Sequence, residues 1–221
     1  MKALIYGACP LGRSIMRTLE DEGKYEIVGI IDDFKEKGLK YHNLVVLGDF
    51  SSLTQLKEEG VDSIFSGIGY SNMRLRGELF NRIKKMGFKT PNVIHSSAII
   101  DKSAILGSGI DIFAGAIVDN DAKISDNVLI HIGSTVAHDV IIHNNVFVSA
   151  NATIAGFVEI HEESFIGAGS SIKDQIKIGR NVIVGLGAVV IKDVPDNTVV
   201  AGVPARIIRE NFEKIQPIAI Q

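Results

Sequence analysis

A period of six residues governs the second half of the chain and limits what it can fold into. Cut from Val93, the sequence divides into 17 successive hexads that reach residue 194 without an insertion. The second place of every hexad is Ile, Val or Leu, the sixth is Ala, Ser, Val or Ile, and the fifth is Gly, Asn or Asp in 12 of the 17. Six residues are too few for a pair of helices but suit one short strand and a turn.

Each hexad would supply one side of a triangular coil, so that three hexads complete one turn. The aliphatic second place would point inward, the small sixth place would fill the narrow interior, and the fifth place would accept a left-handed backbone. The 33 Ile against 13 Leu also favour β-structure. A β-sandwich is the other interpretation, but nothing in a sandwich requires a constant period of six. We therefore predict a stacked coil of short strands over residues 91–195.

Residues 1–90 follow a different pattern, in which short apolar runs alternate with segments of helical spacing. The runs predict strands over residues 2–6, 25–31, 44–47 and 62–68, and the helical spacing predicts helices over residues 11–23, 51–60 and 72–86. Strands that alternate with helices imply a small parallel sheet with covered faces. We expect an α/β domain here, followed by the coil.

The composition excludes several classes of function. The net charge is −3 and no block of like charge occurs, so nothing suggests binding to nucleic acid or to an anionic membrane. One cysteine, Cys9, is too few for an internal disulfide framework or a cysteine-based zinc site. The apolar run at the start is too short for a signal peptide, and no apolar stretch is long enough to span a membrane. We expect a cytoplasmic protein.

The sequence resembles the hexapeptide-repeat acyltransferases, which fold as left-handed parallel β-helices. The hexads carry this resemblance, together with AGVPARIIRE (201–210) after them. The chain is also similar to the sugar acetyltransferases grouped with sialic-acid O-acyltransferase homologues, through MKALIYGA at the start, GIIDD (29–33), GIG (67–69) and VAHD (136–139). The resemblance implies a Rossmann-like nucleotide-sugar domain before the β-helix and a tail over residues 196–221 that closes the cofactor groove.

The same resemblance implies an enzyme that moves an acetyl group from acetyl-CoA to the amino group of a nucleotide-linked amino sugar. Members are typically homotrimers that hold acetyl-CoA between neighbouring β-helices, and the reaction needs neither a metal nor a covalent acyl-enzyme. Two other functions stay open, because no residue distinguishes an amine from a hydroxyl acceptor. One is O-acetylation of a sugar hydroxyl, including that of sialic acid, and the other is a non-catalytic β-helix binding protein.

Transfer to an amine needs a base, because the amine must lose a proton as it attacks the thioester carbonyl. Histidine is the usual base for such a step, since imidazole titrates close to neutral pH. The resemblance assigns this role to His138 and makes Asp139 the acid that supports it. The alternative is a solvated histidine on a turn, which any of the six histidines could be.

Equivalent places of successive coils should stack in columns, and one column at the fourth place of the hexads is small or apolar apart from its first member. It consists of Ser96, Ala114, Ile132, Ala150, Ala168 and Leu186. Such a column needs cover, which a neighbouring subunit or an extended cofactor arm would supply. We assign Ala168 and Leu186 to cofactor binding, together with Phe147 and with Gly156, which leaves room beside His138.

Phe147 departs from the pattern of the family. Many members carry at this place, further along the chain than the base, a second histidine that can contact the acetyl carbonyl. The group that stabilises the thioester oxyanion is therefore open, with a backbone N–H and His131 as the alternatives.

The first strand-to-helix turn carries the signal for a nucleotide. Gly7 and Gly12 bracket it, and Asp32 follows at the end of the second predicted strand, which is the layout of dinucleotide-binding folds. Cys9 replaces the second glycine of that motif, so the evidence for NAD is weak. The resemblance instead implies that this crevice holds the nucleotide and sugar of the substrate, with contacts from Pro10, Leu11, Gly12, Asp32, Asp33 and Gly69. Ordinary turn chemistry is the alternative for the glycines.

Two further histidines, His143 and His161, fall at the third place of their hexads and lie one coil apart. A stacked pair of imidazoles can bind a metal ion. Because no carboxylate or cysteine accompanies them at ligand spacing, we predict that they are solvated turn residues.

Overall fold

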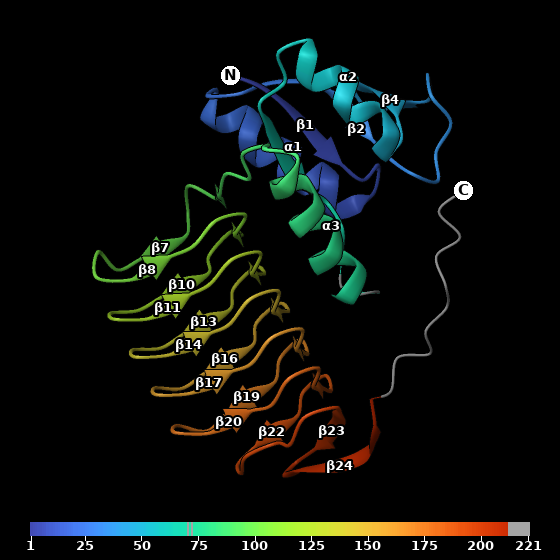
Figure 1. Cartoon of the computed structure of the whole chain (residues 1–221). Coiled ribbons are helices and arrows are strands. Elements are labelled where there is room, and N and C mark those ends of the chain that lie inside the picture. The colour runs from blue at the N-terminus through green and yellow to red at the C-terminus, as the bar shows by residue number, and fades with distance from the viewer. Residues whose placement is uncertain (70, 72, 212–221) are drawn as a thin grey trace.

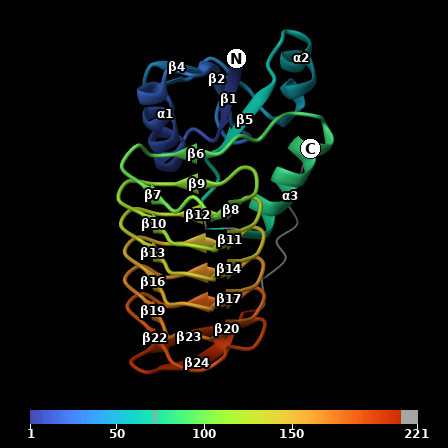
Figure 2. The same ribbon diagram turned by 90° about the vertical axis from the view of Figure 1, so that its left-hand side faces the viewer.

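The structure, a computed structural model, describes residues 1–69, 71 and 73–211. An α/β unit stands at one end, and a long three-sided coil runs away from it (Figure 1). In the side view the strands of successive coils lie one above the other (Figure 2). The fold class is confirmed: a Rossmann-like unit precedes a left-handed parallel β-helix.

A five-stranded sheet of order β3-β4-β2-β1-β5 forms the centre of the α/β unit. Its strands are β1 (Lys2–Tyr6), β2 (Glu26–Ile31), β3 (Lys40–Tyr41), β4 (Leu44–Gly48) and β5 (Ser63–Ser66). All neighbours pair in parallel except β3, which forms an antiparallel hairpin with β4. The four parallel strands confirm the prediction. The strand β3 was not predicted, because so short a strand carries no periodic signal.

Helices cover both faces of this sheet. They are α1 (Pro10–Glu22), α2 (Leu53–Glu58), which follows a 3-10 turn (Phe50–Ser52), and α3 (Met73–Lys85). Ile5 of β1 packs in the cluster that includes the apolar side of α1, whereas its neighbour Tyr6 packs with leucines of α2 and α3. The three predicted helices are confirmed, although Asn72, the expected start of the third, lies outside the described residues. Among the described helices, none is both long and apolar enough to cross a bilayer.

Each of the 17 hexads begins with a short strand, so the predicted repeat is present over its whole length. The first side of the coil holds β6 (Val93–Ile94), β9 (Asp111–Ile112), β12 (Leu129–Ile130), β15 (Phe147–Val148), β18 (Phe165–Ile166) and β21 (Ile183–Val184). The second holds β7 (Ile99–Ile100), β10 (Ile117–Val118), β13 (Thr135–Val136), β16 (Thr153–Ile154), β19 (Ser171–Ile172) and β22 (Val189–Val190). The third holds β8 (Ile105–Leu106), β11 (Lys123–Ile124), β14 (Ile141–Ile142), β17 (Glu159–Ile160) and β20 (Lys177–Ile178).

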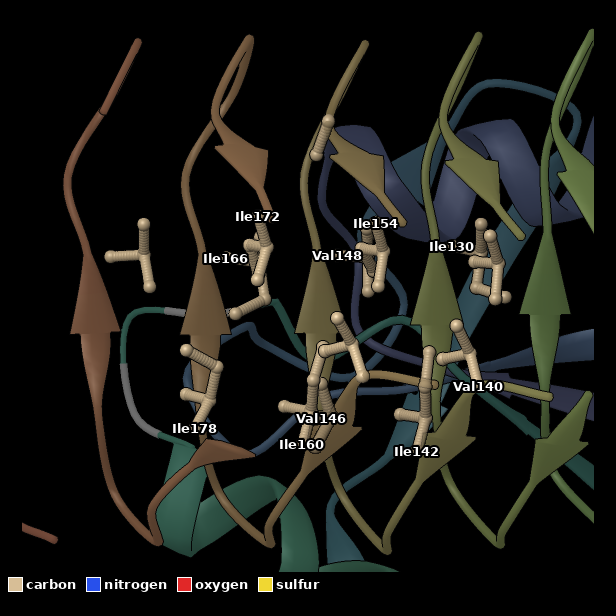
Figure 3. Packing of buried hydrophobic residues seen from close by; sticks show 14 of the residues in the cluster. Ile130, Val140, Ile142, Val146, Val148, Ile154, Ile160, Ile166, Ile172 and Ile178 are labelled. Carbon is tan, nitrogen blue, oxygen red and sulfur yellow. The ribbon is translucent and has the colours of Figure 1, made fainter. Parts of the chain in front are cut away.

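The aliphatic second place of the hexads fills the interior of the coil, as predicted. Each strand pairs with the strand three hexads further along the chain, so that Val136 lies beside Ile154 and Ile154 beside Ile172. Figure 3 shows these side chains stacked in rows along the axis, with Val140 and Val146 from the sixth place between them. Burial of one such aliphatic side chain contributes about 1.5–3 kcal/mol, so the repeat stabilises itself coil by coil.

The corners of the coil adopt the left-handed backbone predicted for the fifth place. Nine residues other than glycine and five glycines have positive φ there, which makes 14 of the 17 corners. Most of the nine are Asn or Asp, which accept this conformation readily. Phe157 adopts it too, with φ of 60°. A left-handed backbone at a bulky aromatic residue is uncommon and points to a use for its side chain.

The coil continues beyond the last hexad. β23 (Thr198–Gly202) pairs in parallel with β21, and β24 (Ala205–Glu210) folds back along β23 in the antiparallel direction. Val200 of β23 is buried in the core of the coil. The described part of the tail therefore caps the β-helix, and closure of a cofactor groove by the tail stays a prediction.

A fully buried arginine ties the α/β unit to the coil. Arg76 of α3 donates from Nε to the carbonyl of Ile68 at 3.0 Å and from Nη1 to the carbonyl of Asn127. Its Nη2 lies 3.7 Å from the carboxylate of Asp111 on β9. Asn145 on the next coil accepts from Nη1 at 3.3 Å. These contacts fix the position of α3 beside the first coils, where Figure 1 shows it.

Candidate active site

His138 stands on the corner that follows β13 and carries a carboxylate partner. Its Nδ1 lies 3.0 Å from Oδ2 of Asp139, whose own backbone is left-handed with φ of 57°. When Nδ1–H donates to Asp139, the lone pair of the ring is on Nε2. The His138 side chain is 45% exposed. An oriented imidazole with a free nitrogen at an open corner can take a proton from a bound substrate.

Gly156 lies one coil beyond His138 and provides the space that the imidazole occupies. A Cβ at Gly156 would stand 2.6 Å from Cε1 and 2.7 Å from Nε2 of His138. Atoms cannot approach so closely, so no other residue fits here while the ring holds its position. The room expected beside His138 is thus filled by the ring itself, and the assignment of Gly156 to the cofactor stays a prediction.

Phe157 is a site residue that the sequence analysis missed. Its ring stands edge-on to His138, with centroids 5.1 Å apart and an interplanar angle of 85°. The side chain is 55% exposed in spite of its size. The sequence does carry a signal for Phe157. It occupies a fifth place, where Gly, Asn or Asp is usual, one coil after the VAHD segment.

The apolar column at the fourth place is present and lies on the neighbouring corner. Backbone N–H groups donate across successive coils, from Gly169 to Ala150 and from Gly187 to Ala168, each at 2.9 Å. Leu186 is 74% exposed at one end of the described column. The second side of the coil joins this corner to the corner of His138, since β13 lies between Ile132 and His138. An extended ligand on that side could therefore contact both corners.

Phe147 does not share this surface. It lies on the first side of the coil and is only 4% exposed, within the cluster that joins the coil to α1. Its ring stacks on that of His131, with centroids 6.4 Å apart, and is tilted against that of Phe165, with centroids 5.6 Å apart. A side chain so covered offers no contact to a cofactor on the second side, so we leave Phe147 out of the proposed cofactor site.

His131 occupies an aromatic setting next to Phe147. Its ring lies 5.3 Å from that of Phe113, and its Nδ1 is buried without a hydrogen-bond partner among the described residues. Burial lowers the pKa of His131, because desolvation disfavours the charged form. A neutral imidazole with one buried nitrogen is a poor proton acceptor but can still donate a hydrogen bond.

The residues of the predicted crevice lie where the carboxyl ends of β2, β1 and β5 meet. The backbone N–H of Ala8 donates to Asp32 at 2.8 Å, and the thiol of Cys9 donates to the carbonyl of Gly67 at 3.1 Å. A Cβ at Gly12 would stand 2.2 Å from the carbonyl oxygen of Gly7. Close backbone packing therefore explains Gly12 without a ligand. Open α/β sheets bind their ligands at this edge.

The other predicted crevice residues differ in what they offer a ligand. Pro10 is exposed at the first turn of α1, and Leu11 packs partly against the core. Gly69 has open space around it, since a Cβ there would meet no atom within 4 Å. Pro10 and Leu11 begin α1, and the N-terminal end of a helix favours an anion because its first N–H groups have no partner within the helix.

Both aspartates of the crevice already hold protein groups. Asp32 accepts from the N–H of Phe34 at 2.9 Å in addition to Ala8. Asp33 accepts from the hydroxyl of Tyr6 at 2.5 Å and from the N–H of Phe50 at 2.9 Å. Burial, and then the hydrogen bond to Asp33, raise the pKa of Tyr6. These aspartates shape the loops, and each carboxylate oxygen retains a second lone pair for a ligand.

Known proteins match both parts of the chain. Residues 2–83 match the PglD N-terminal domain family, and residues 121–156 match the bacterial transferase hexapeptide (six repeats) family. A histidine variant of perosamine N-acetyltransferase from Caulobacter crescentus, in complex with CoA and GDP-perosamine, has a TM-score of 0.90 and 30% identity, over 95% of this chain and 98% of that one. The acetyltransferase domain of PglB from Neisseria gonorrhoeae, in complex with acetyl coenzyme A, has a TM-score of 0.86 and 32% identity, over 94% and 98%. WeeI from Acinetobacter baumannii has a TM-score of 0.83 and 26% identity, over 94% and 100%.

The hexapeptide coil and the likeness to solved acetyltransferases place the chain among the acyltransferases. The α/β unit, and the similarity of nearly the whole chain to the two acetyltransferases above, narrow the class to enzymes that act on sugars. The chain belongs to the hexapeptide-repeat sugar acetyltransferases.

Proposed function

We propose that this enzyme transfers the acetyl group of acetyl-CoA to the amino group of a nucleotide-linked amino sugar. The observation that carries the proposal is the His138–Asp139 pair, with the ring held against Gly156 and Nε2 free. The similar perosamine N-acetyltransferase, which was solved with CoA and GDP-perosamine, supports both substrates.

In the proposed reaction the neutral amine attacks the thioester carbonyl, and a new C–N bond forms. His138 accepts the proton that the amine loses, and Asp139 stabilises the imidazolium that results. The C–S bond then breaks, and the departing thiolate takes the proton from His138. Backbone N–H groups are the remaining candidates to stabilise the oxyanion, because His131 packs beside Phe147 on the first side of the coil. Every atom and charge is accounted for without a covalent acyl-enzyme.

We assign acetyl-CoA to the second side of the coil, along Ala168 and Leu186. The exposed leucine and the small side chains of this corner suit an extended ligand, and they suit a neighbouring subunit equally well. We therefore propose a homotrimer in which the cofactor lies between two coils. Light scattering should then give three times the 23.9 kDa of one chain, and a monomer would contradict the shared groove.

We assign the nucleotide to the crevice of the α/β unit. Its diphosphate would lie at the N-terminal end of α1 near Pro10 and Leu11, where free N–H groups favour an anion. The first turn of α1 carries no acidic side chain that would repel a phosphate. Asp32, Asp33 and Gly69 would contact the base, the ribose or the sugar. We also propose that the enzyme works in the cytoplasm, since its single cysteine implies no internal disulfide.

A substrate panel tests the proposed function. The enzyme is incubated with acetyl-CoA and a set of nucleotide-linked amino sugars, and free CoA thiol is measured. Matched nucleotide sugars with a hydroxyl in place of the amine form the second arm. We expect thiol release with at least one amino sugar and none with its hydroxyl counterpart. Release with the hydroxyl sugars alone would assign the enzyme to O-acetylation instead.

A further inference from the structure

Three potential metal ligands meet on the third side of the coil, the side that follows the His138 corner. Nε2 of His143 lies 3.0 Å from Oε1 of Glu159, and Nε2 of His161 lies 3.7 Å from the same oxygen. The ligand atoms of the three residues all lie within 4.8 Å of one another. The sequence analysis expected no carboxylate beside these histidines, and the structure corrects that expectation.

The backbone of the coil places these side chains together. β14 and β17 lie side by side on the third face (Figure 2), with Ile141 paired to Glu159. The N–H of His143 donates to the carbonyl of Ile160, so the imidazoles stand one coil apart and stack at 4.8 Å with an angle of 6°. Glu159 begins β17 and His161 directly follows that strand, so the alternation of side chains along extended backbone points both to the same face.

We propose that His143, Glu159 and His161 bind one divalent transition-metal ion of the Zn²⁺ type. Two imidazole nitrogens and one carboxylate oxygen are ligands that Zn²⁺ prefers, and water would fill the fourth position. Bonds of about 2.0–2.1 Å in a tetrahedral site separate ligand atoms by about 3.3 Å. The distances of 3.0 and 3.7 Å to Glu159 lie on either side of that value. The two imidazoles stack with an angle of 6° between their planes, so both rings must tilt before their in-plane lone pairs meet at one ion.

The surroundings keep the site accessible. All three side chains are about one-third exposed, at 32%, 27% and 35%, so an ion can enter from solvent. Lys177 lies 3.6 Å from Oε2 of Glu159, which leaves Oε1 to the two imidazoles. The ion would replace the proton that His143 shares with Glu159 and would clamp two successive coils together.

Calorimetry with ZnCl₂ on the full chain, after treatment with a chelator, tests the site. We expect one ion per chain with a dissociation constant at or below the micromolar range. His143→Ala and His161→Ala should each weaken Zn²⁺ binding at least about 10–100-fold. Glu159→Gln, which keeps the shape of the side chain but removes its charge, should also weaken Zn²⁺ binding. His95→Ala is the matched control, because His95 holds the same hexad place without a stacked histidine, and it should bind like the parent.

Two further readouts separate a built site from loose surface binding. Co²⁺ should give the visible absorption of a tetrahedral complex in the parent, and Mg²⁺ should not compete with it. Zn²⁺ at about 100-fold above its dissociation constant should raise Tm by about 5 °C or more in the parent but not in His161→Ala. The proposal is wrong if the parent takes up no Zn²⁺, or if both histidine variants bind it unchanged. Neither readout depends on acetyl transfer, so failure here leaves the proposed function untouched.

Discussion

The imidazole of His138 lies in the space that the absent side chain of Gly156 leaves on the following coil, with Cε1 only 2.6 Å from the place of a Cβ. The repeat thus positions the proposed base with a glycine at the equivalent place of the next coil. Positioning of this kind matters because a displacement of about 1 Å at a reacting group costs up to about 100-fold in rate.

Gly156→Ala should therefore lower kcat about 10–100-fold with little loss of stability. Its φ does not lie in the left-handed region, so the backbone accepts alanine, and the methyl group displaces only the ring. Steady-state kinetics and thermal unfolding of the variant measure the two effects. Asp174→Ala, one coil further along the same column, is the control and should leave kcat unchanged. A Gly156→Ala enzyme with parental kcat would show that the ring position is not needed.

His138→Ala should lower kcat about 10²–10⁴-fold, the usual contribution of a positioned base. The KM for acetyl-CoA should change little, because the cofactor is assigned to Ala168 and Leu186 on the neighbouring corner. Asp139→Asn should have a smaller effect, since this residue orients the ring and stabilises its charged form. His95→Ala serves as the control for loss of a half-buried histidine outside the proposed site. Retention of more than half of kcat in His138→Ala, with chemistry rate-limiting, would refute the base assignment.

Phe157→Asn should raise stability and lower activity together. Asparagine accepts the left-handed backbone at φ of 60°, and relief of that strain is worth about 1–2 kcal/mol. Loss of the ring leaves His138 without its edge-on neighbour, so kcat should fall several-fold. Urea unfolding and kinetics on the same preparation measure both quantities. Gln175→Asn, at a corner with φ of 61° on the next coil, should gain stability without loss of kcat.

The buried pair of Arg76 and Asp111 should make stability depend on pH. Burial raises the pKa of Asp111 to about 7 against the opposing charge of Arg76. Between the unfolded pKa of about 3.9 and about 7 the folded state holds a proton that the unfolded chain releases. This contribution to stability is therefore complete below about pH 4 and is lost as pH rises through about 7.

Urea unfolding of the parent and of Asp111→Asn across pH 5 to 8 measures this dependence. The parent should lose stability relative to the variant over that range, because asparagine does not titrate. Asp101→Asn, an exposed carboxyl at the start of the coil, controls for the loss of one charge. Parallel curves for the parent and Asp111→Asn would mean that Asp111 does not exchange a proton on unfolding.

The sequence predicts the coil more completely than the site, for a physical reason. The repeat of six residues in the sequence determines where the strands lie and pairs equivalent places three hexads apart. The contact of Val136 with Ile154, 18 residues later, can therefore be predicted from residue numbers alone. The meeting of Glu159 with His143 does not, because it joins different hexad places on the outer face and depends on side-chain rotamers. The contact of Arg76 with the coil depends on how α3 docks, which no local pattern encodes. The resemblance to the family identified His138 as the base. Phe157 was not predicted as a site residue, although it departs from the residues usual at the fifth place.

The constant register of three hexads per coil fixes the position of each residue along the axis of the coil. Each coil advances the chain by one strand spacing of about 4.8 Å, and the α/β unit is anchored at one end through Arg76. The distance from the crevice to His138 along the axis of the coil can consequently change only by whole steps. Insertion or deletion of one complete coil above it would move the histidine by one step and keep every other contact of the corner. A change in the number of coils would therefore adapt such an enzyme to a longer or shorter acceptor and keep the same active-site residues.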